Sequence, residues 1–100
     1  MGIRERKRPP SHPGKVIRGL YLEPFSISIS TLSKTLGVSR KTVSRIVNGK
    51  GAVRADMALR LSRAFNTSPE VWLNLQRNYD LWHAERQSEN VQSVEMPATM

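Results

Sequence analysis

Apolar residues recur every three or four positions through the middle of the chain, a spacing that predicts several short amphipathic helices. The first of them is expected to run from Pro13 to about Glu23, because Pro24 discourages a helix from continuing. The residues that this spacing turns toward the core are Val16, Ile17, Leu20 and Tyr21. A loop over residues 25–27 then leads to the next helix.

Residues 28–48 have the pattern of two short helices that cross at a tight turn centred on Gly37. Glycine suits such a turn because it adopts a positive φ at no steric cost. Ser28 and Ser39 stand where a side-chain oxygen could cap each helix. The apolar residues that would pack the two helices together are Leu32, Leu36, Val38, Val43 and Ile46. This layout is that of a helix-turn-helix, a motif that reads DNA.

The outer face of the second motif helix is basic and polar, while Val43, Ile46 and Val47 fall on its inner face. In the major groove Arg and Lys donate to guanine, and Asn pairs with adenine. We expect the leading base readers to be Arg40, Lys41 and Arg45, helped by Ser44 and Asn48. The residues expected at phosphates are Ser39, Thr42 and Lys50. Such a face is often only a solvated surface, but the glycine-centred turn and the apolar register favour DNA reading.

Two more helices are expected after the motif. One runs from about Ala55 to Phe65, and its inward residues are Met57, Ala58, Leu61, Ala64 and Phe65. The other begins at Ser68-Pro69-Glu70, three residue types that favour a helix start, and extends to about Arg86. The pattern therefore predicts an all-α fold of five helices, with one domain over residues 13–86 and the motif at residues 28–48.

The last helix carries more apolar surface than a five-helix domain needs to close its core. Its main stripe consists of Val71, Trp72, Leu75, Tyr79 and Trp82. Trp72 and Leu75 are expected in the core. Two interpretations stay open for Leu73, Leu81 and Trp82: they are scattered surface residues, or they form the interface of a homodimer whose two motifs read two half-sites.

The chain has 100 residues and a net charge of +8, and the positive excess lies in its first half. Residues 1–50 contain eleven basic and two acidic side chains, whereas residues 51–100 contain five and six. A positive field around the motif would concentrate a polyanion there and make its binding salt-dependent. The charge could equally serve RNA, an acidic protein or an anionic membrane surface. No apolar run approaches the roughly 20 residues that span a bilayer, and without a signal-peptide pattern a cytoplasmic location is the default.

The two ends of the chain differ from its helical middle. Residues 1–12 contain Arg4, Arg6, Lys7 and Arg8 before two prolines, which predicts a flexible basic arm. This arm could lie against phosphates or in a minor groove, or it could remain a solvated tail. Residues 87–100 are mostly polar, and Pro97 precludes a regular helix, so a disordered tail is expected there.

The sequence offers no candidate catalytic or metal site. It contains no cysteine, and His12 and His83 lie near opposite ends of the ordered region without a ligand-like spacing. The carboxylates are better interpreted as helix-end charges than as paired catalytic acids. We therefore expect no enzymatic activity, metal, cofactor or small-molecule substrate.

The segment from His12 to Trp82 resembles the HigA-type antitoxins of bacterial toxin-antitoxin modules, within the Xre-like group that includes lambdoid phage repressors. Three stretches carry the resemblance: HPG at residues 12–14 with LEP at 22–24, the helix-turn-helix ending in VNGK at 47–50, and TSPEVWLNLQ at 67–76 followed by YDLW at 79–82. The segment within which they lie is about seventy residues long.

The resemblance implies a lambda-repressor-like homodimer that binds the double-stranded operator of its own promoter and neutralises a small mRNA-cleaving toxin. It also implies base contacts from Arg40, Lys41 and Arg45. Family members commonly carry acidic residues near Lys15 and Arg18, so the positive charge here argues against a shared toxin-facing role and could extend the phosphate-binding surface. Two other functions stay open: a stand-alone repressor without a toxin, and a protein-interaction module that no longer reads DNA.

Overall fold

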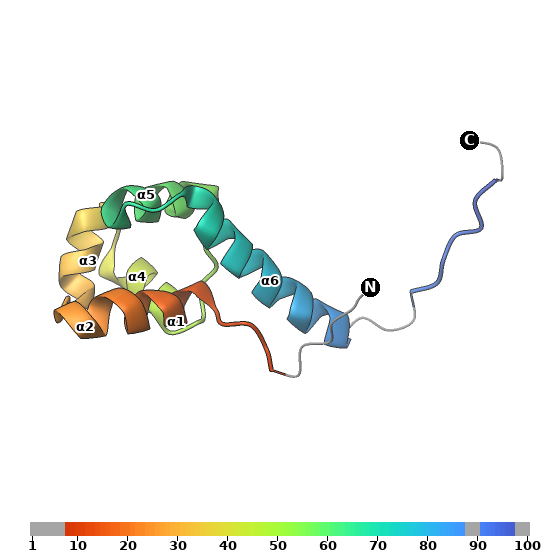
Figure 1. The fold of residues 1–100 in the computed structure, drawn as a ribbon, viewed down its shortest axis with the longest axis horizontal. Helices are drawn as coiled ribbons and strands as arrows, with labels where there is room; N and C mark the ends of the chain where they lie inside the picture. Colours follow the sequence, from red (N-terminus) through yellow and green to blue (C-terminus); the bar gives the residue numbers. More distant parts are fainter. Residues whose placement is uncertain (1–7, 88–90, 98–100) are drawn as a thin grey trace.

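A computed structural model describes residues 8–87 and 91–97 of the chain. Within these residues the fold consists of five helical segments and contains no strand, which confirms the all-α prediction. Figure 1 shows α5 facing α1 and α2 across the domain, with α6 running from the end of α5 toward the start of α1. The elements are α1 (Pro13–Ile17), η1 (Arg18–Leu22), α2 (Glu23–Phe25), α3 (Ile29–Leu36), α4 (Arg40–Val47), α5 (Ala55–Phe65) and α6 (Pro69–Gln87). No described helix combines the length and apolar character needed to traverse a bilayer.

The first segment is a continuous helix whose middle turn, η1, is π-helical. Hydrogen bonds in a π turn span five residues, so Leu22 comes to lie on the buried side with Ile17. Leu20 was expected to face the core from the regular three- and four-residue spacing of an α-helix, but it is 61% exposed. The prediction for Leu20 was therefore wrong, whereas Ile17 is buried and Val16 and Tyr21 pack against the core.

The first segment also ends later than expected. Pro24 lies in the first turn of α2, where its missing N–H is tolerated. The helix continues to Phe25 and is closed by Ser26, whose φ of 53° is left-handed. The expected end at Glu23 was two residues too early, and Phe25 belongs to the helix and not to the loop.

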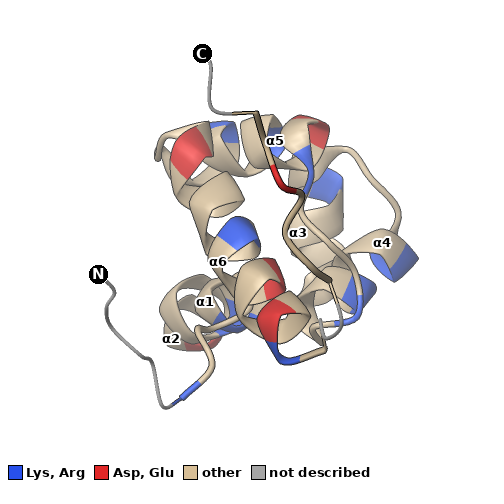
Figure 2. Cartoon of the chain, turned by 90° about the vertical axis from the view of Figure 1, so that its right-hand side faces the viewer, with Lys and Arg blue, Asp and Glu red and all other residues tan. Residues whose placement is uncertain are grey.

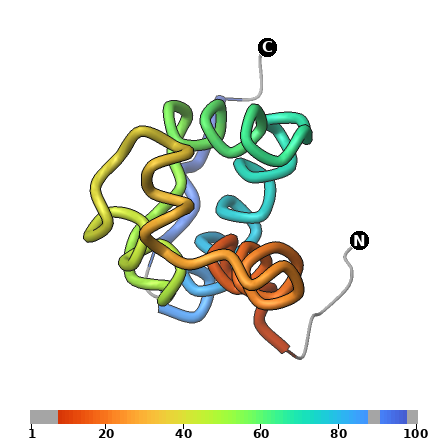
Figure 3. Tube along the Cα trace, turned by 90° about the vertical axis from the view of Figure 1, so that its left-hand side faces the viewer, coloured from red at the N-terminus to blue at the C-terminus, as the bar shows by residue number. Residues whose placement is uncertain are grey.

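The helix-turn-helix forms as predicted from the sequence. Gly37 closes α3 with φ 73°, and its N–H donates to the Ser33 carbonyl at 2.9 Å. Ser28 Oγ accepts the Thr31 amide at 3.0 Å, and the buried side of both helices is apolar. Figure 3 shows the motif helices α3 and α4 following one another along the chain, connected by the turn that begins at Gly37. The buried motif residues are Leu32, Ser33, Leu36, Val43, Ile46 and Val47, with Val38 partly buried.

An aromatic cluster connects the first segment to the last two helices. The rings of Tyr21 and Phe65 stack with their centroids 3.9 Å apart, and both lie near Trp72. Trp72 is 1% exposed, and its indole N–H donates to Thr67 Oγ1 at 2.7 Å. The core role predicted for Trp72 is confirmed, and Leu75 packs at the edge of the core. In α5 the buried apolar residues are Met57, Ala58 and Leu61.

The stripe predicted along α6 is narrower than expected. Val71, which was expected on the inner side, is 45% exposed, whereas the polar Gln76 is buried there. Gln76 is satisfied there because its Oε1 accepts the Val53 amide at 2.8 Å and its Nε2 donates to Asp80 at 2.9 Å. Through its hydrogen bond to Val53, Gln76 connects the loop between α4 and α5 to α6.

The predicted arm and tail are described only in part. Arg4, Arg6 and Lys7 lie outside the described residues, and Arg8 is exposed. Residues 91–97 have no regular secondary structure, and residues 88–90 and 98–100 lie outside the described part of the chain. The arm and the tail therefore stay predictions.

Candidate nucleic-acid interface

The second motif helix, α4, is positioned by a close backbone approach from the first segment. A Cβ built on Gly14 would lie 1.8 Å from the Ile46 carbonyl oxygen and 2.9 Å from Val47 Cα. Only glycine allows the two backbones to come so near. His12 caps the same helix start, because its Nδ1 accepts the Gly14 amide at 2.8 Å. The HPG stretch therefore fixes where α4 lies.

His12 is buried and also contacts the last helix. Its ring meets that of Tyr79 edge to face, with the centroids 4.9 Å apart. Burial lowers the pKa of His12 below its ordinary value, although a hydrogen bond with the Gly51 backbone and the negative charge of Asp80 act in the opposite direction. The neutral ring suits this place, since a protonated Nδ1 could not accept the Gly14 amide.

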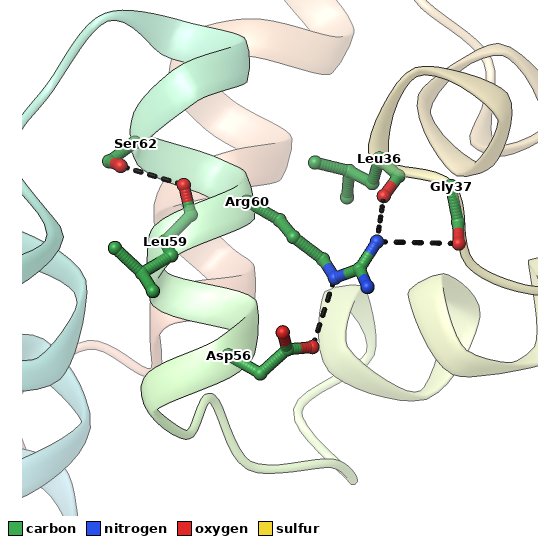
Figure 4. A network of polar contacts seen from close by, with 6 residues as sticks. All are labelled: Leu36, Gly37, Asp56, Leu59, Arg60 and Ser62. Carbon is green, nitrogen blue, oxygen red and sulfur yellow. Dashed lines mark hydrogen bonds and ion pairs between the residues drawn. The ribbon is translucent and has the colours of Figure 1, made fainter.

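Arg60 of α5 holds the turn between the motif helices, as Figure 4 shows. Its Nη1 donates to the Leu36 carbonyl at 2.6 Å and more weakly to the Gly37 carbonyl at 3.4 Å. Its Nε donates to Asp56 one turn earlier on α5, at 2.9 Å. Carbonyl groups at the end of a helix lack partners within that helix, so Arg60 both satisfies the end of α3 and fixes the turn relative to α5.

The face that α4 presents to solvent is basic. Neither α3 nor α4 contains an acidic residue. Figure 2 shows the Lys and Arg positions of α4 at one edge of the molecule, while the acidic positions lie on other elements. The side chains of Arg40 and Lys41 are exposed and have no hydrogen-bond or ion-pair partner among the described residues, and they line a shallow groove with Ile29 and Ser44. Both cations are free to reach a polyanion.

The two hydroxyl residues at the start of α4 are paired with each other. Ser39 Oγ accepts the Thr42 amide at 3.1 Å, which confirms it as the helix cap, and it lies 2.9 Å from Thr42 Oγ1. Both side chains are exposed. They lie beside Arg40 at the N-terminal end of the helix, where the unpaired amides favour anions.

The remaining predicted site residues gather at the other end of α4. Arg45 donates from Nη2 to the Lys50 carbonyl at 3.0 Å, so its guanidinium also holds the turn that follows the helix. Asn48 Nδ2 donates to Ser44 Oγ at 3.3 Å, and Asn48 Oδ1 accepts from Arg18 Nη2 at 2.7 Å. The structure thus brings Arg18 of the first segment to the reading helix. This contact was not predicted, although the charge at Arg18 was noted as a possible extension of the surface.

Three supporting residues were not predicted from the sequence. His12 was considered only for metal binding and, with Gly14, as part of the HPG stretch that carries the family resemblance, and Arg60 was not singled out. A glycine within a helical pattern often marks a close backbone approach, and Arg60 stands four residues after Asp56, a spacing that favours an ion pair. These patterns suggest structural roles, but only the tertiary fold shows that α4 and its turn are the partners.

The residues predicted for a dimer interface lie along the outer part of α6. Leu73 is 36% exposed and Leu81 is 51% exposed. Trp82 is half-buried, and the Arg86 guanidinium covers its ring at 3.6 Å from the centroid. The two leucines are therefore exposed apolar side chains, whereas Trp82 is partly covered by its own helix.

Comparison with known proteins places this geometry in context. Residues 20–72 match the helix-turn-helix family. A helix-turn-helix-type transcriptional regulator of Haemophilus influenzae is 41% identical over 87 residues, which span 87% of this chain and 81% of that protein. Antitoxin HigA-1 of Vibrio cholerae is 40% identical over 80 residues, 80% of this chain and 75% of the relative. The solved structure of antitoxin GraA in complex with its operator has a TM-score of 0.81 and 39% identity, covering 95% of this chain and all 100% of that one.

Proposed function

The chain belongs to the helix-turn-helix family, with the HigA-1 antitoxin among its relatives, and we propose that it is an operator-binding antitoxin. It binds double-stranded DNA at its own promoter, represses that operon, and neutralises a partner toxin that cleaves mRNA. This activity belongs in the cytoplasm, where bacterial DNA and mRNA lie. The chain acts as a binding protein and not as an enzyme.

The observation that carries the proposal is the free basic face of α4. Arg40 and Lys41 stand on the outer side of a helix whose inner side is buried, and no acidic residue of α3 or α4 neutralises them. Arg45 lies one turn further along this face. Residues near the start of a recognition helix contact base edges in the major groove, which supports Arg40 and Lys41 as base readers. Arg45, in the last turn of α4, is proposed as the third base reader because it continues the same basic face.

The DNA-reading role is tested by removing two of these cations. Lys41→Ala with Arg45→Ala should reduce discrimination between the gene's upstream duplex and a scrambled duplex by at least ~30-fold, since each base contact contributes about 1–3 kcal/mol. Arg63→Ala with Arg77→Ala is the matched control, because it removes the same charge from exposed positions on α5 and α6. Fluorescence anisotropy at fixed salt measures the affinity of each double variant for the two duplexes. Equal losses in the two double variants would show that only net charge matters.

The antitoxin role is distinguished from a stand-alone repressor by a protein partner. Expression of this chain with the product of the neighbouring gene should yield a stable complex on size exclusion, and ribosome-dependent mRNA cleavage by that product should stop in the complex. A chain that discriminates its promoter but neither binds nor inhibits that product is a stand-alone repressor.

Dimerisation is proposed to use the outer side of α6. Leu73 and Leu81 are exposed there, and two motifs in one dimer would read two half-sites about one helical turn of DNA apart. Light scattering should report about twice the monomer mass of 11.3 kDa. Leu73→Glu with Leu81→Glu should return the monomer mass and weaken operator binding. A wild-type monomer at tens of micromolar would refute this interface.

A further inference from the structure

Arg18 and Asn48 form a side-chain pair that joins the first segment to the end of α4. Gly14 lets the first segment approach α4 at Ile46, and Arg18 follows Gly14 by four residues, which places it on the same side of the helix. From there Arg18 Nη2 reaches Asn48 Oδ1 at 2.7 Å, two residues beyond Ile46. The pair is therefore a product of the helix packing and not of neighbouring positions in the sequence.

The contact decides which atoms Asn48 can offer to DNA. A guanidinium only donates, so the Asn48 atom facing Arg18 is the carbonyl oxygen. Adenine recognition by Asn needs both that oxygen, to accept from N6, and the amide N–H, to donate to N7. With Oδ1 accepting from Arg18 and one N–H on Ser44 Oγ, Asn48 retains one free N–H and one lone pair of Oδ1. The free N–H suits an acceptor, whereas a two-point contact with adenine would require Oδ1 to accept from Arg18 and from adenine N6 at the same time.

The surroundings favour phosphate as that acceptor. Asn48 closes the C-terminal end of α4, whereas base edges are reached mainly from the N-terminal residues of a recognition helix. The Arg18 guanidinium uses one of its five N–H groups on Asn48 and has no other hydrogen-bond partner among the described residues. Lys50 is exposed two residues further on. Two cations and an amide donor thus stand together at this end of the helix.

We propose that Arg18 and Asn48 act as one phosphate-binding pair at the C-terminal end of α4, with Arg18 as the positioning residue that turns the Asn48 amide N–H toward the DNA backbone. The pair contributes affinity and register but does not read a base. It rests on the proposed DNA-binding function and assigns Asn48 a different part in it from the base-reading role expected from the sequence.

The test uses two substitutions at Asn48 in the full chain. Asn48→Asp keeps the contact with Arg18 as an ion pair but places a negative charge at the backbone, so it should bind less tightly than Asn48→Ala while melting at or above the wild-type temperature. For each variant the loss of affinity should be the same on every duplex, whether the upstream duplex, its single-base substitutions or a scrambled duplex, and for Asn48→Ala it should be about three- to tenfold. Loss of preference at one base pair would overturn the proposal.

The positioning role of Arg18 is tested by coupling. Arg18→Met should lower the salt dependence of binding by about one counterion, and its loss of affinity should be smaller in the Asn48→Ala background than in the wild type. Arg63→Met is the matched control, because Arg63 is an exposed cation on α5 whose side chain has no partner among the described residues. Equal effects of Arg18→Met and Arg63→Met, each additive with Asn48→Ala, would overturn the pairing. A wild type that binds neither duplex would refute the DNA-binding function itself.

Discussion

Replacement of Gly14 by alanine should weaken the fold by forcing the first segment away from α4. The new Cβ would lie 1.8 Å from the Ile46 carbonyl oxygen, and that distance must widen to at least 3.0 Å before the contact is tolerable. Every close neighbour is a backbone atom of Ile46 or Val47, so no side-chain rotation can relieve the clash. The helices must move apart, and the core between them must open.

The cost follows from the known effects of overpacking. Extra atoms in a packed interior cost about 1–3 kcal/mol, occasionally more, and the better helix propensity of alanine returns less than about 1 kcal/mol. We expect a net loss of about 2 kcal/mol for Gly14→Ala. In a domain of this size that lowers the melting temperature by roughly 8–16 °C. Urea unfolding followed by circular dichroism measures the free energy directly.

Gly19 provides the matched control within the same helical segment. A Cβ on Gly19 would meet nothing within 4 Å, so Gly19→Ala should be neutral or stabilise the fold by up to about 1 kcal/mol through reduced freedom of the unfolded chain. Gly14→Ala should thus lower the urea midpoint, whereas Gly19→Ala should leave it unchanged or raise it. If both variants unfold at the same urea concentration as the wild type, the close approach of Gly14 does not limit stability and the reasoning is refuted.

Three further predictions concern the polar contacts that Arg60, Gln76 and His12 make within the fold. Arg60→Met should lower the free energy of unfolding by about 1–2 kcal/mol, because the Leu36 carbonyl loses its charged donor; an unchanged urea midpoint would contradict this. Gln76→Leu should cost about 1–3 kcal/mol by leaving the buried Val53 amide unpaired, and stability equal to wild type would contradict that. Burial lowers the pKa of His12 in the folded state, so stability should decrease as the pH falls from about 6.5 through the folded pKa. His12→Asn, which can still cap the helix, should remove this contribution, and an unaltered pH profile would count against it.

The helix-turn-helix could be predicted from the sequence because its determinants are local. Gly37 takes the positive φ that the turn requires, and the two serine caps act within three residues of their own positions. The inner face of α4 followed from helical periodicity, and Trp72 from its place in a strong apolar stripe. Each of these inferences rests on residue types and spacings within one helix and the turns at its ends.

The errors arose where distant residues or an altered helix decide the outcome. The register of Leu20 depends on a π turn, which changes the spacing of buried positions and leaves no pattern in the sequence. Gln76 is buried because a loop amide 23 residues away needs an acceptor. Arg18 meets Asn48 across 30 residues. Such contacts follow from tertiary packing, which periodicity does not describe.

The central claim is that the face of α4 reads a particular DNA sequence. Its most direct test is the ratio of the wild-type dissociation constants for the scrambled duplex and for the duplex upstream of the gene, measured at 150 mM salt. Specific DNA-binding proteins reach ratios of roughly 10³ or more, and we predict a ratio of at least that size. Equal dissociation constants for the two duplexes would contradict the account.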